Sequence, residues 1–540
     1  MTGDPRGDLT EGVAQSTFKL PEIPEEERTP LVVSLLEIIH YQQEMIQGLK
    51  DEVARLKEQK TKPKLRPSAL NKKGSKKRKP DKRPGSKKRN KLESLEIHDR
   101  INVSPEEPVP VNSRFKGYQT YTVQDLVIAP RNTVYRLERW RTPDGKILKG
   151  KLPDGISGHF GATLTSFILY QYYHAHVTQP LLWEQLVDLG VDISVGQLNR
   201  IITEGNERFH EEKAEILRVG LEVSSYVNVD DTGARHRGKN GYCTHIGNEL
   251  FAYFESTGSK SRRNFLQILR QGHKDFVLSE PGLELMGLQK MPKGHLEQLR
   301  AHLGRRFEDD EAWQEFLLSL GITKSRHVRI ATEGALLGSV LDHGVNPKLI
   351  VVSDDAGQFN LLILLHALCW IHAERLLAKL VGFNENHRND LAQVRGQIWD
   401  LYQILKLYKQ NPNDTLAAEI RERYDFIFTQ KTSYETLNQL LTRLNKNKSE
   451  LLLVLEHPEL PLHNNLSEGD VREYVKKRKI SGSTRSDDGR RSRDSFASLK
   501  KTCRKLGVSF WHYLKDRVSG LYRIEPLSEL IRQRAQEAFG

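Results

Sequence analysis

The residues best suited to chemistry are acidic side chains at the ends of predicted strands or near the start of a predicted helix. Asp230 and Asp231 end the strand-like stretch SSYVNVDD, and Asp354 ends the apolar run KLIVVSDD. Glu468 opens a late helix. If they meet, carboxylates from separate elements supply the hard oxygen ligands that Mg²⁺ or Mn²⁺ prefers. Two such ions can activate a water or a 3′-hydroxyl and stabilise the leaving oxygen of a phosphodiester.

Each of these acids also has a purely structural interpretation. Side chains alternate along a strand, so Asp230 and Asp231 face opposite sides and only one of them can join Asp354. Asp230 and Asp231 could instead cap the turn that follows, and Asp354 or Asp355 could be the N-cap of the next helix. Glu468 follows Asn465 at the spacing of a capping box, in which the glutamate bonds its own backbone rather than a metal.

The elements that would position the acids are expected in the order of a ribonuclease H-like fold. Three strand-like stretches within residues 221–256 precede a helix, and the apolar run over 348–355 predicts a strand buried on both faces. The stretch 275–346 before that run is expected to be irregular and polar, and a long apolar helix is expected over 360–380. Ligands in such a sheet gather at the carboxyl ends of the parallel strands, where Asp354 stands.

The predicted fold class is therefore α/β, a ribonuclease H-like core made of a mixed sheet with flanking helices and carrying a helical insertion. A coiled-coil helix, a basic linker, a small β module and a helix-turn-helix region are expected to precede it. The predicted boundaries are 1–57 for the N-terminal segment with the coiled-coil helix, 58–98 for the basic linker, 99–157 for the β module, 158–220 for the helical region, 221–383 and 457–540 for the two parts of the core, and 384–456 for the insertion.

The N-terminal segments have features of dimerisation and of DNA binding. Apolar residues from Leu35 to Leu56 recur close to heptad spacing, which predicts either a short coiled coil or a single amphipathic helix docked on its own body. Residues 60–91 contain 16 Lys or Arg and one acid, so this linker should be disordered and attract phosphate. Residues 99–157 show short alternating stretches broken by proline and a turn, which predict the small β-rich module.

A helical hairpin within residues 158–220 is the predicted DNA-reading element. Two amphipathic helices are separated by a glycine turn, and a serine is placed to cap the second helix. That second helix carries Gln197, Asn199 and Arg200, which suits a helix-turn-helix whose second helix enters a major groove. Any helical hairpin with a glycine turn has the same pattern, so a purely structural hairpin is the alternative.

Composition narrows the class of protein. The 540 residues suffice for about three or four domains. The net charge of +13 is concentrated in the linker over 60–91, whose local charge is +15. Three widely spaced cysteines without a C-x-x-C pair exclude a disulfide framework and a structural zinc ribbon. No apolar run is long enough to span a bilayer and no phosphate-loop or dinucleotide motif occurs, so neither membrane contact nor a nucleotide cofactor is expected.

Together with their flanking residues, the acids form a pattern typical of one family. The segments VNVDDTGARHRGKNGYCTHIG, VVSDDAGQFNLLILLHALCWIHAERLL and LPLHNNLSEGDVREYVKKRKISGS resemble the three acidic blocks of the insertion-sequence sixty-six family of DDE transposases. The segment SFASLKKTCRKLGVSFWHYL is similar to that family's closing helix, and the resemblance covers roughly residues 158–520. The family's zinc ribbon has no counterpart, because residues 99–157 contain no cysteine, so any DNA contact there must be metal-free.

Carried over position by position, the resemblance makes Asp230, Asp354 and Glu468 the catalytic acids and the ligands of two Mg²⁺ or Mn²⁺ ions. Cys369 and His372 are expected on one face of a helix, and Cys369 alone also fits a small buried hydrophobe. The residues expected to support the acids are Cys369, His372, Asn464 and Asn465. The residues expected to contact DNA in this part of the chain are Arg472, Arg478, Lys479, Arg490 and Arg491.

The leading interpretation is an enzyme, a transposase that cleaves the ends of a mobile element and joins the freed 3′-hydroxyl to target DNA. Its partners would be double-stranded DNA, as element ends and as target, and further copies of the chain in a homodimer or higher oligomer. It would act in the bacterial cytoplasm in association with the nucleoid. Two alternatives use the same scaffold: a non-enzymatic DNA-binding regulator, and a ribonuclease H-like nuclease acting on branched DNA.

Overall fold

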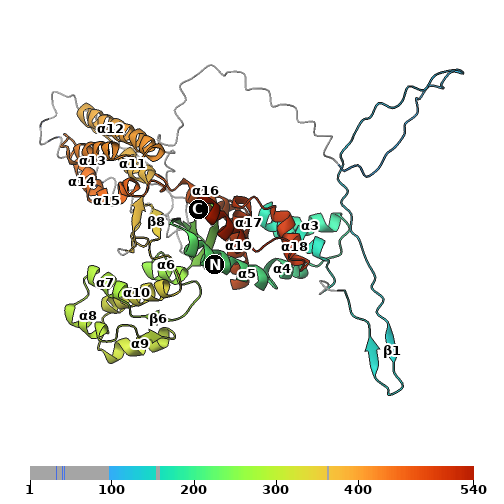
Figure 1. Cartoon of the computed structure of the whole chain (residues 1–540), viewed down its shortest axis with the longest axis horizontal. Helices are drawn as coiled ribbons and strands as arrows, with labels where there is room; N and C mark the ends of the chain where they lie inside the picture. The colour runs from blue at the N-terminus through green and yellow to red at the C-terminus, as the bar shows by residue number, and fades with distance from the viewer. Residues whose placement is uncertain are drawn as a thin grey trace, which may run out of the picture. The chain divides into compact units, whose positions relative to one another are not determined.

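The computed structural model describes residues 96–153, 158–361 and 364–539, together with Thr29, Val32, Ile39 and Gln42. The chain divides into two units, one of residues 1–71 and 373–446 and the other of residues 72–372 and 447–540. Figure 1 follows the chain through both units. Apart from Ile39 and Gln42, the expected coiled-coil helix lies outside the described residues, as does nearly all of the expected basic linker.

The larger unit is built on a mixed five-stranded sheet with the strand order β5-β4-β3-β8-β9. Strands β3 (Tyr226–Gly233), β4 (Tyr242–Gly247) and β5 (Ala252–Thr257) form an antiparallel meander. Strand β8 (Ile350–Ser353) joins β3 in parallel, and β9 (His366–Leu368) joins β8 in parallel. The predicted α/β class with a mixed sheet is confirmed.

The expected long helix over 360–380 is wrong in its first half. The structure places strand β9 there, paired with β8 in the register Val351↔His366, and the helix α11 (Trp370–Ala378) begins only afterwards. A short apolar run satisfies the pattern of a buried helix and of a strand buried on both faces alike. The free edge of β8 decides between them, because its backbone groups need partners inside the protein.

Helix α17 (Asp487–Lys505) covers the edge strand β5. Three of its side chains, four residues apart on one helix face, accept from successive outward N–H groups of β5. Asp494 accepts from Ser256 at 2.9 Å, Ser498 from Phe254 at 2.9 Å and Thr502 from Ala252 at 3.1 Å. The spacing matches because two strand residues and four helix residues both advance about 6 Å. The helix thereby protects an edge that would otherwise pair with another chain.

Residues 275–346 were expected to be irregular, and this expectation is wrong because they form a compact, mostly helical insertion. Local start signals explain its helices: Ser279 accepts from the Gly282 N–H and Asp309 from the Ala312 N–H. Trp313 is fully buried and stacks on Phe276. The elements from the end of the meander onward are α6 (Arg262–Leu269), β6 (Phe276–Val277), α7 (Glu280–Leu288), α8 (Lys293–Arg300), β7 (Arg306–Phe307), α9 (Asp310–Ser319) and α10 (Ser325–Asp342).

The remaining helices flank the sheet or form the smaller unit. Before the sheet lie α2 (Ala162–Leu169), the π-helical turn η3 (Tyr170–His174), α3 (Gln179–Asp188), α4 (Val195–Thr203) and α5 (Glu207–Val223). After α11, the smaller unit contains α12 (Glu385–Gln410), α13 (Asp414–Thr429) and α14 (Glu435–Lys446). The larger unit then resumes with α15 (Lys448–Leu451), η4 (Leu453–Leu455), α16 (Asn465–Ser481), α17, α18 (Phe510–Val518) and α19 (Leu527–Phe539). No helix in the described ranges is long and apolar enough to cross a membrane.

The β-rich module expected over 99–157 is reduced to one hairpin. Strands β1 (Arg139–Arg141) and β2 (Ile147–Lys149) are the only strands among the described residues of that range. The alternating stretch GYQTYTVQDLVI forms no strand, because no neighbouring strand lies beside it to take its backbone hydrogen bonds. Alternation in a sequence indicates a strand only where such a neighbour exists.

Candidate active site

The register of the sheet brings Asp230 and Asp354 to the same place. The parallel pair β3/β8 ends at Asn228↔Val352, and each acid lies two residues beyond that pair. Side chains two residues apart share a face, so Asp230 and Asp354 are on the same side of the sheet and Asp231 is on the other. The sequence pattern predicts that β3 ends at Asp230 and Asp231. The strand instead continues to Gly233 in antiparallel pairing with β4.

Glu468 comes to this site on the first turn of α16, which two buried polar residues hold against the sheet through three hydrogen bonds. The Asn464 side chain donates to the Val229 carbonyl at 2.7 Å and accepts from Asn228 at 2.9 Å. The Ser467 hydroxyl lies 2.7 Å from Nδ1 of His245 on β4. Because Asn464 is the N-cap residue and its side chain is turned to β3, these bonds fix where the helix begins.

The capping-box interpretation of Glu468 requires Asn465 as the N-cap. In the structure Asn465 is instead the first residue of the helix. Two basic side chains lie beside the Glu468 carboxylate: Nη2 of Arg472 is 3.5 Å from Oε2, and Nε2 of His372 is 3.8 Å from Oε1.

The electrostatics of Asp230 show that the three acids share one environment. Burial, followed by the charges of Asp354, Asp231 and Glu468, raises the pKa of Asp230 to about 7, although an N–H bond from Asp231 opposes the shift. Oδ1 of Asp354 is buried and has no hydrogen-bond partner in the described part of the chain. A divalent cation site needs several carboxylate oxygens close together, and the mutually repelling acids with the unbonded Oδ1 of Asp354 fit this need.

The three carboxylates are gathered but not closed into a tight ligand cluster. Among the described residues, the group whose possible ligand atoms all lie within 4.8 Å of one another is His273, Asp275 and His343 in the insertion. The Asp275 carboxylate there is already engaged by Arg306 at 2.7 Å, as well as by Ser339 and His343. The two imidazoles stack in parallel, 3.4 Å apart. A metal would have to displace these partners, so this group is not the site indicated by the sequence.

Asp231, on the other side of β3, has both oxygens bonded. Thr244 of β4 donates to Oδ1 at 2.5 Å, and Gln358 donates to Oδ2 at 3.0 Å. Burial raises the pKa of Asp231, and these two hydrogen bonds oppose the shift. Gln358 lies four residues after Asp354 and was missed by sequence reasoning, since an amide in a loop has no pattern of its own. It ties the loop that carries Asp354 to β3.

Cys369 and His372 do not lie on one helix as expected. Cys369 precedes α11, and its carbonyl accepts from the His372 N–H at 3.0 Å. The Cys369 sulfur accepts the Asn464 N–H at 3.2 Å, and burial raises the pKa of the thiol to about 11. A neutral, buried thiol acts as a small apolar group that locates the start of α16. Cys369 therefore helps to position the start of α16, the helix that carries Glu468.

The other acids of α16 are committed elsewhere. At 3.6 residues per turn, Asp470 points to nearly the opposite side of the helix from Glu468. It pairs with Lys505 at 2.9 Å, and Glu473 pairs with Lys500 and with Lys501. Burial opposes ionisation, but hydrogen bonds from these two lysines outweigh it and lower the pKa of Glu473 to about 2. Neither acid is therefore available to hold a metal beside Asp230.

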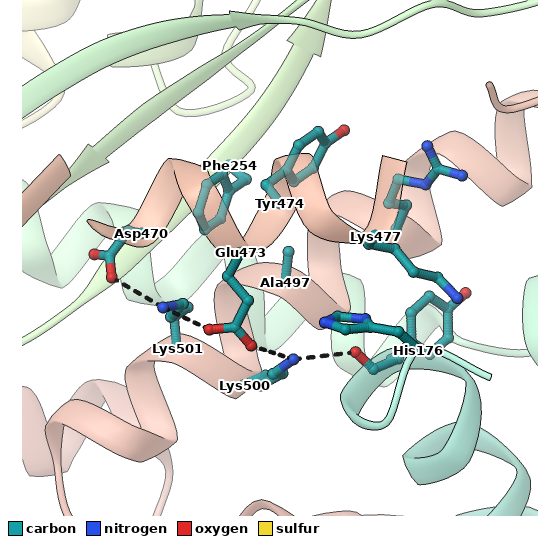
Figure 2. A pocket seen from close by; sticks show the side chains of 11 residues that line it. His176, Phe254, Asp470, Glu473, Tyr474, Lys477, Ala497, Lys500 and Lys501 are labelled. Atoms are coloured by element: carbon teal, nitrogen blue, oxygen red, sulfur yellow. Dashed lines mark hydrogen bonds and ion pairs between the residues drawn. The ribbon is translucent and has the colours of Figure 1, made fainter. Parts of the chain in front are cut away.

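These ion pairs surround a small cavity between α16 and α17 (Figure 2). Its volume of about 20 Å³ admits one or two water molecules and no substrate. Lys477, which lines it, donates to the Tyr172 carbonyl at 2.6 Å, and Lys500 donates to the Tyr173 carbonyl at 3.2 Å. Both lysines thus satisfy carbonyls of the π-helical turn η3. The cavity belongs to the packing of the helices and not to the active site.

The predicted DNA-contacting residues of α16 and α17 lie at the surface or near it. Arg472 and Lys479 are exposed, and Nη1 of Arg478 reaches the Thr232 hydroxyl at 3.4 Å. On α17, Arg491 is exposed and Arg490 pairs with Asp487. Arg478 is thus the one of these that contacts the strand carrying Asp230.

The predicted helical hairpin consists of α3 and α4. Gly190, with φ of +83°, ends α3, and the Ser194 hydroxyl caps α4 by accepting from the Gln197 N–H at 3.1 Å. Asn199 and Arg200 are exposed on α4, and Arg200 donates to the Gln197 side chain at 2.5 Å. Gln197 and Arg200, three residues apart, therefore share one face of α4. Asn199 points to nearly the opposite side from Gln197 and accepts from the Gln179 side chain of α3 at 3.3 Å.

Two comparisons with known proteins bear on this arrangement. Residues 325–492 match the model of the family described as Transposase IS66 family, a range that includes Asp354 and Glu468 but not Asp230. The chain is 44% identical over 324 residues to the uncharacterized protein y4jO of Sinorhizobium fredii. The aligned region covers 59% of this chain and 100% of that protein. With an acid after β8 and another on α16 inside the matched range, this chain belongs to the transposase IS66 family.

Proposed function

We propose that the chain is a DDE transposase that cleaves the ends of a mobile element and joins the freed 3′-hydroxyl to target DNA. The observation that carries the proposal is the register of β3 and β8, which places Asp230 and Asp354 on the same side of the sheet. Burial, followed by the charges of Asp354, Asp231 and Glu468, raises the pKa of Asp230, in keeping with three acids from separate elements near one point. The antiparallel meander β3–β5 followed by the parallel strand β8 supports the proposal, because these elements follow one another in the order expected of a ribonuclease H-like core.

The acids Asp230, Asp354 and Glu468 would hold two Mg²⁺ or Mn²⁺ ions. Bound there, the ions would supply an activated water or 3′-hydroxyl and stabilise the leaving oxygen of a phosphodiester. The protein's part is to hold three carboxylates together against their mutual repulsion. The bonds of Asn464 to β3, of Ser467 to His245 and of Gln358 to Asp231 support this.

Double-stranded DNA would contact the protein at two surfaces. The α3–α4 hairpin would read element ends through Gln197, Asn199 and Arg200. The exposed cations of α16 and α17 would hold phosphates near the acids and so position the scissile bond. A transposase that joins two ends must bring both together, so we expect a dimer or higher oligomer on DNA, in the cytoplasm where the chromosome lies.

Strand joining with defined ends tests this function against its two alternatives. With Mg²⁺, the protein should nick supercoiled DNA and join duplexes carrying the element's own ends to a target plasmid. A regulator on the same scaffold would bind DNA and never nick it. A branched-DNA nuclease would nick but would join no ends. Joining that is lost when the end sequence is scrambled would support the transposase alone.

A further inference from the structure

The hairpin β1–β2 is a separate, closed structural unit. Its strands pair in the register Arg139↔Lys149, Trp140↔Leu148 and Arg141↔Ile147. The turn is closed by the Thr142 N–H donating to the Lys146 carbonyl at 2.8 Å, with Gly145 at φ +84°. Every residue of both strands is exposed. A hairpin that is solvated on both faces is marginally stable alone, so binding of a partner to either face would stabilise it.

One face of the hairpin is cationic and lacks counter-charges. Residues opposite each other point to the same side of the ribbon, so Arg139, Arg141 and Lys149 share a face, on which Ile147 is the one apolar strand residue. None of the three side chains has a hydrogen bond or ion pair within the described ranges. Arg139 and Lys149 stand directly opposite each other, and like charges in that position destabilise a ribbon. An anion between them would remove this repulsion.

The other face is apolar and narrow. Trp140 and Leu148 form its cross-strand pair and are 64% and 48% exposed. The indole N–H donates to Glu138 at 2.9 Å, which holds the ring beside the strand. Two side chains are too few for the core of a protein interface, which typically buries about 800 Å² on each partner. They suffice to pack on sugars or on the edge of a groove.

We propose that the hairpin 139–149 is a DNA-binding β-ribbon, in which Arg139, Arg141 and Lys149 bind phosphates and Trp140 packs against the groove. A two-stranded ribbon has the width that the major groove admits. Residues 136–151 carry six Lys or Arg and two acids, so the whole ribbon is complementary to a polyanion. This inference rests on DNA being the substrate of the proposed transposase, and it adds a contact outside α3–α4, α16 and α17.

The test compares two triple variants with equal loss of charge. The ribbon variant is R139Q/R141Q/K149Q, and the matched control K274Q/K293Q/K324Q removes three exposed cations in or directly before the insertion. Binding of the full chain to a short random-sequence duplex is measured without Mg²⁺ between about 50 and 200 mM salt. Each lost phosphate contact removes about 0.9 from the slope of log K against log salt. The ribbon variant should therefore lose about 2 to 3 from the slope and bind about 10- to 100-fold more weakly at the low-salt end.

Two further readouts make the result decisive. Melting temperatures of both variants should equal that of the wild type, because the substituted side chains are exposed. The part of the DNA-induced change in tryptophan fluorescence that comes from the ribbon should disappear in W140F. A ribbon variant with the slope and affinity of the control overturns the proposal, and so does a changed oligomeric state with an unchanged slope, which would make the ribbon a surface for a second copy. Because no Mg²⁺ is present, failure of strand transfer would refute the proposed function and leave this result untouched.

Discussion

The side-chain amide of Gln358 donates a 3.0 Å hydrogen bond to Oδ2 of Asp231. The loop that follows β8 and carries Asp354 is thereby bonded to the strand that carries Asp230. Since neither Gln358 nor Asp231 shares the face of the two catalytic candidates, this bond fixes the site from behind. Substituting residues that hold metal ligands in place commonly lowers metal affinity or activity by about 10- to 100-fold.

Gln358→Leu should raise the Mg²⁺ concentration needed for half-maximal strand transfer by about 10-fold, because the Asp354 loop loses its tie to β3. A Mg²⁺ titration of strand transfer measures this. Thr244→Ser is the matched control, since it keeps the hydroxyl that binds Oδ1 of Asp231. Equal Mg²⁺ requirements in wild type and Gln358→Leu would show that the bond has no part in the metal site.

Glu468→Gln should lower strand transfer by several orders of magnitude while DNA binding and melting temperature persist. The amide keeps the shape of the side chain and removes the charge that a cation needs. Asp230→Asn and Asp354→Asn should behave alike, and any two together should cost little more than one, because the acids act as a unit. Strand transfer near the wild-type rate in Glu468→Gln would show that Glu468 is not a metal ligand. Asp470 and Glu473 could not take its place, because lysines bind both of them.

The raised pKa of Asp230 predicts a pH dependence of stability in the metal-free protein. An unfolded aspartate has a pKa of about 3.9, whereas burial and the neighbouring acids raise that of Asp230 to about 7. The folded state therefore holds the proton more tightly, and this stabilisation is present below about pH 4 and is lost as the pH rises through 7. Wild type should lose about 1 to 3 kcal/mol of unfolding free energy relative to Asp230→Asn between pH 5 and 8.

Denaturant unfolding at a series of pH values, in chelator, measures this difference. Adding Mg²⁺ at pH 8 should restore stability to the wild type and not to Asp230→Asn, because only the carboxylate binds the ion. Parallel pH profiles of the two proteins would mean that Asp230 ionises normally, and the shared environment of the acids would then lose its main support.

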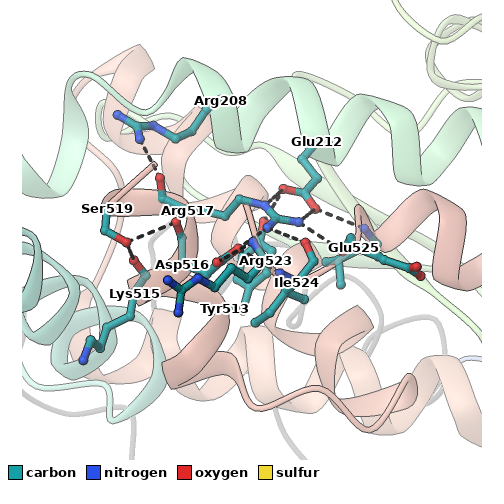
Figure 3. A network of polar contacts seen from close by, with 11 residues as sticks. Arg208, Glu212, Tyr513, Lys515, Asp516, Arg517, Ser519, Arg523, Ile524 and Glu525 are labelled. Carbon is teal, nitrogen blue, oxygen red and sulfur yellow. Dashed lines mark hydrogen bonds and ion pairs between the residues drawn. The ribbon is translucent and has the colours of Figure 1, made fainter. Parts of the chain in front are cut away.

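Arg517 and Glu212 form a buried bidentate pair that joins α18 and α5 (Figure 3). The guanidinium donates to both carboxylate oxygens, at 2.9 and 3.1 Å, and also to carbonyls of the turn before α19. Burial opposes its charge, but Glu212 outweighs burial and holds the pKa of Arg517 above its usual range. Tyr513 donates to the same carboxylate at 2.8 Å.

Arg517→Met should lower the free energy of unfolding by about 3 to 5 kcal/mol, because it leaves two buried carboxylates, those of Glu212 and Asp516, without their cation. Adding Glu212→Leu should restore part of that loss, since a buried pair replaced by apolar residues is often neutral. Urea denaturation of the single and double variants measures both effects. A loss below about 1 kcal/mol in the single variant would contradict the buried geometry.

Arg200→Ala and Gln197→Ala should reduce the preference for element ends over random DNA and leave random-DNA binding unchanged. Base contacts carry sequence discrimination of about 1 to 3 kcal/mol each, whereas phosphate contacts carry none. Competition binding with end-containing and scrambled duplexes measures the preference. Equal losses on both duplexes would assign these α4 residues to the phosphate backbone instead.

The sequence by itself determined the local features of this protein. The acids at the end of KLIVVSDD and in SSYVNVDD, the cap at Ser194 and the glycine that ends α3 are set by neighbours within a few residues. Their patterns were therefore readable. The family followed from the same acidic blocks, because each block is contiguous.

Only the tertiary structure decided how these features meet. Whether His366–Leu368 is a helix or a strand depended on the free edge of β8, and which aspartate joins Asp354 depended on the register of β3 and β8. Whether Glu473 is free to bind a metal depended on Lys500 and Lys501 of α17, which pair with it. Each choice rests on a hydrogen bond or charge supplied from far along the chain, and no local pattern records where such a partner will lie.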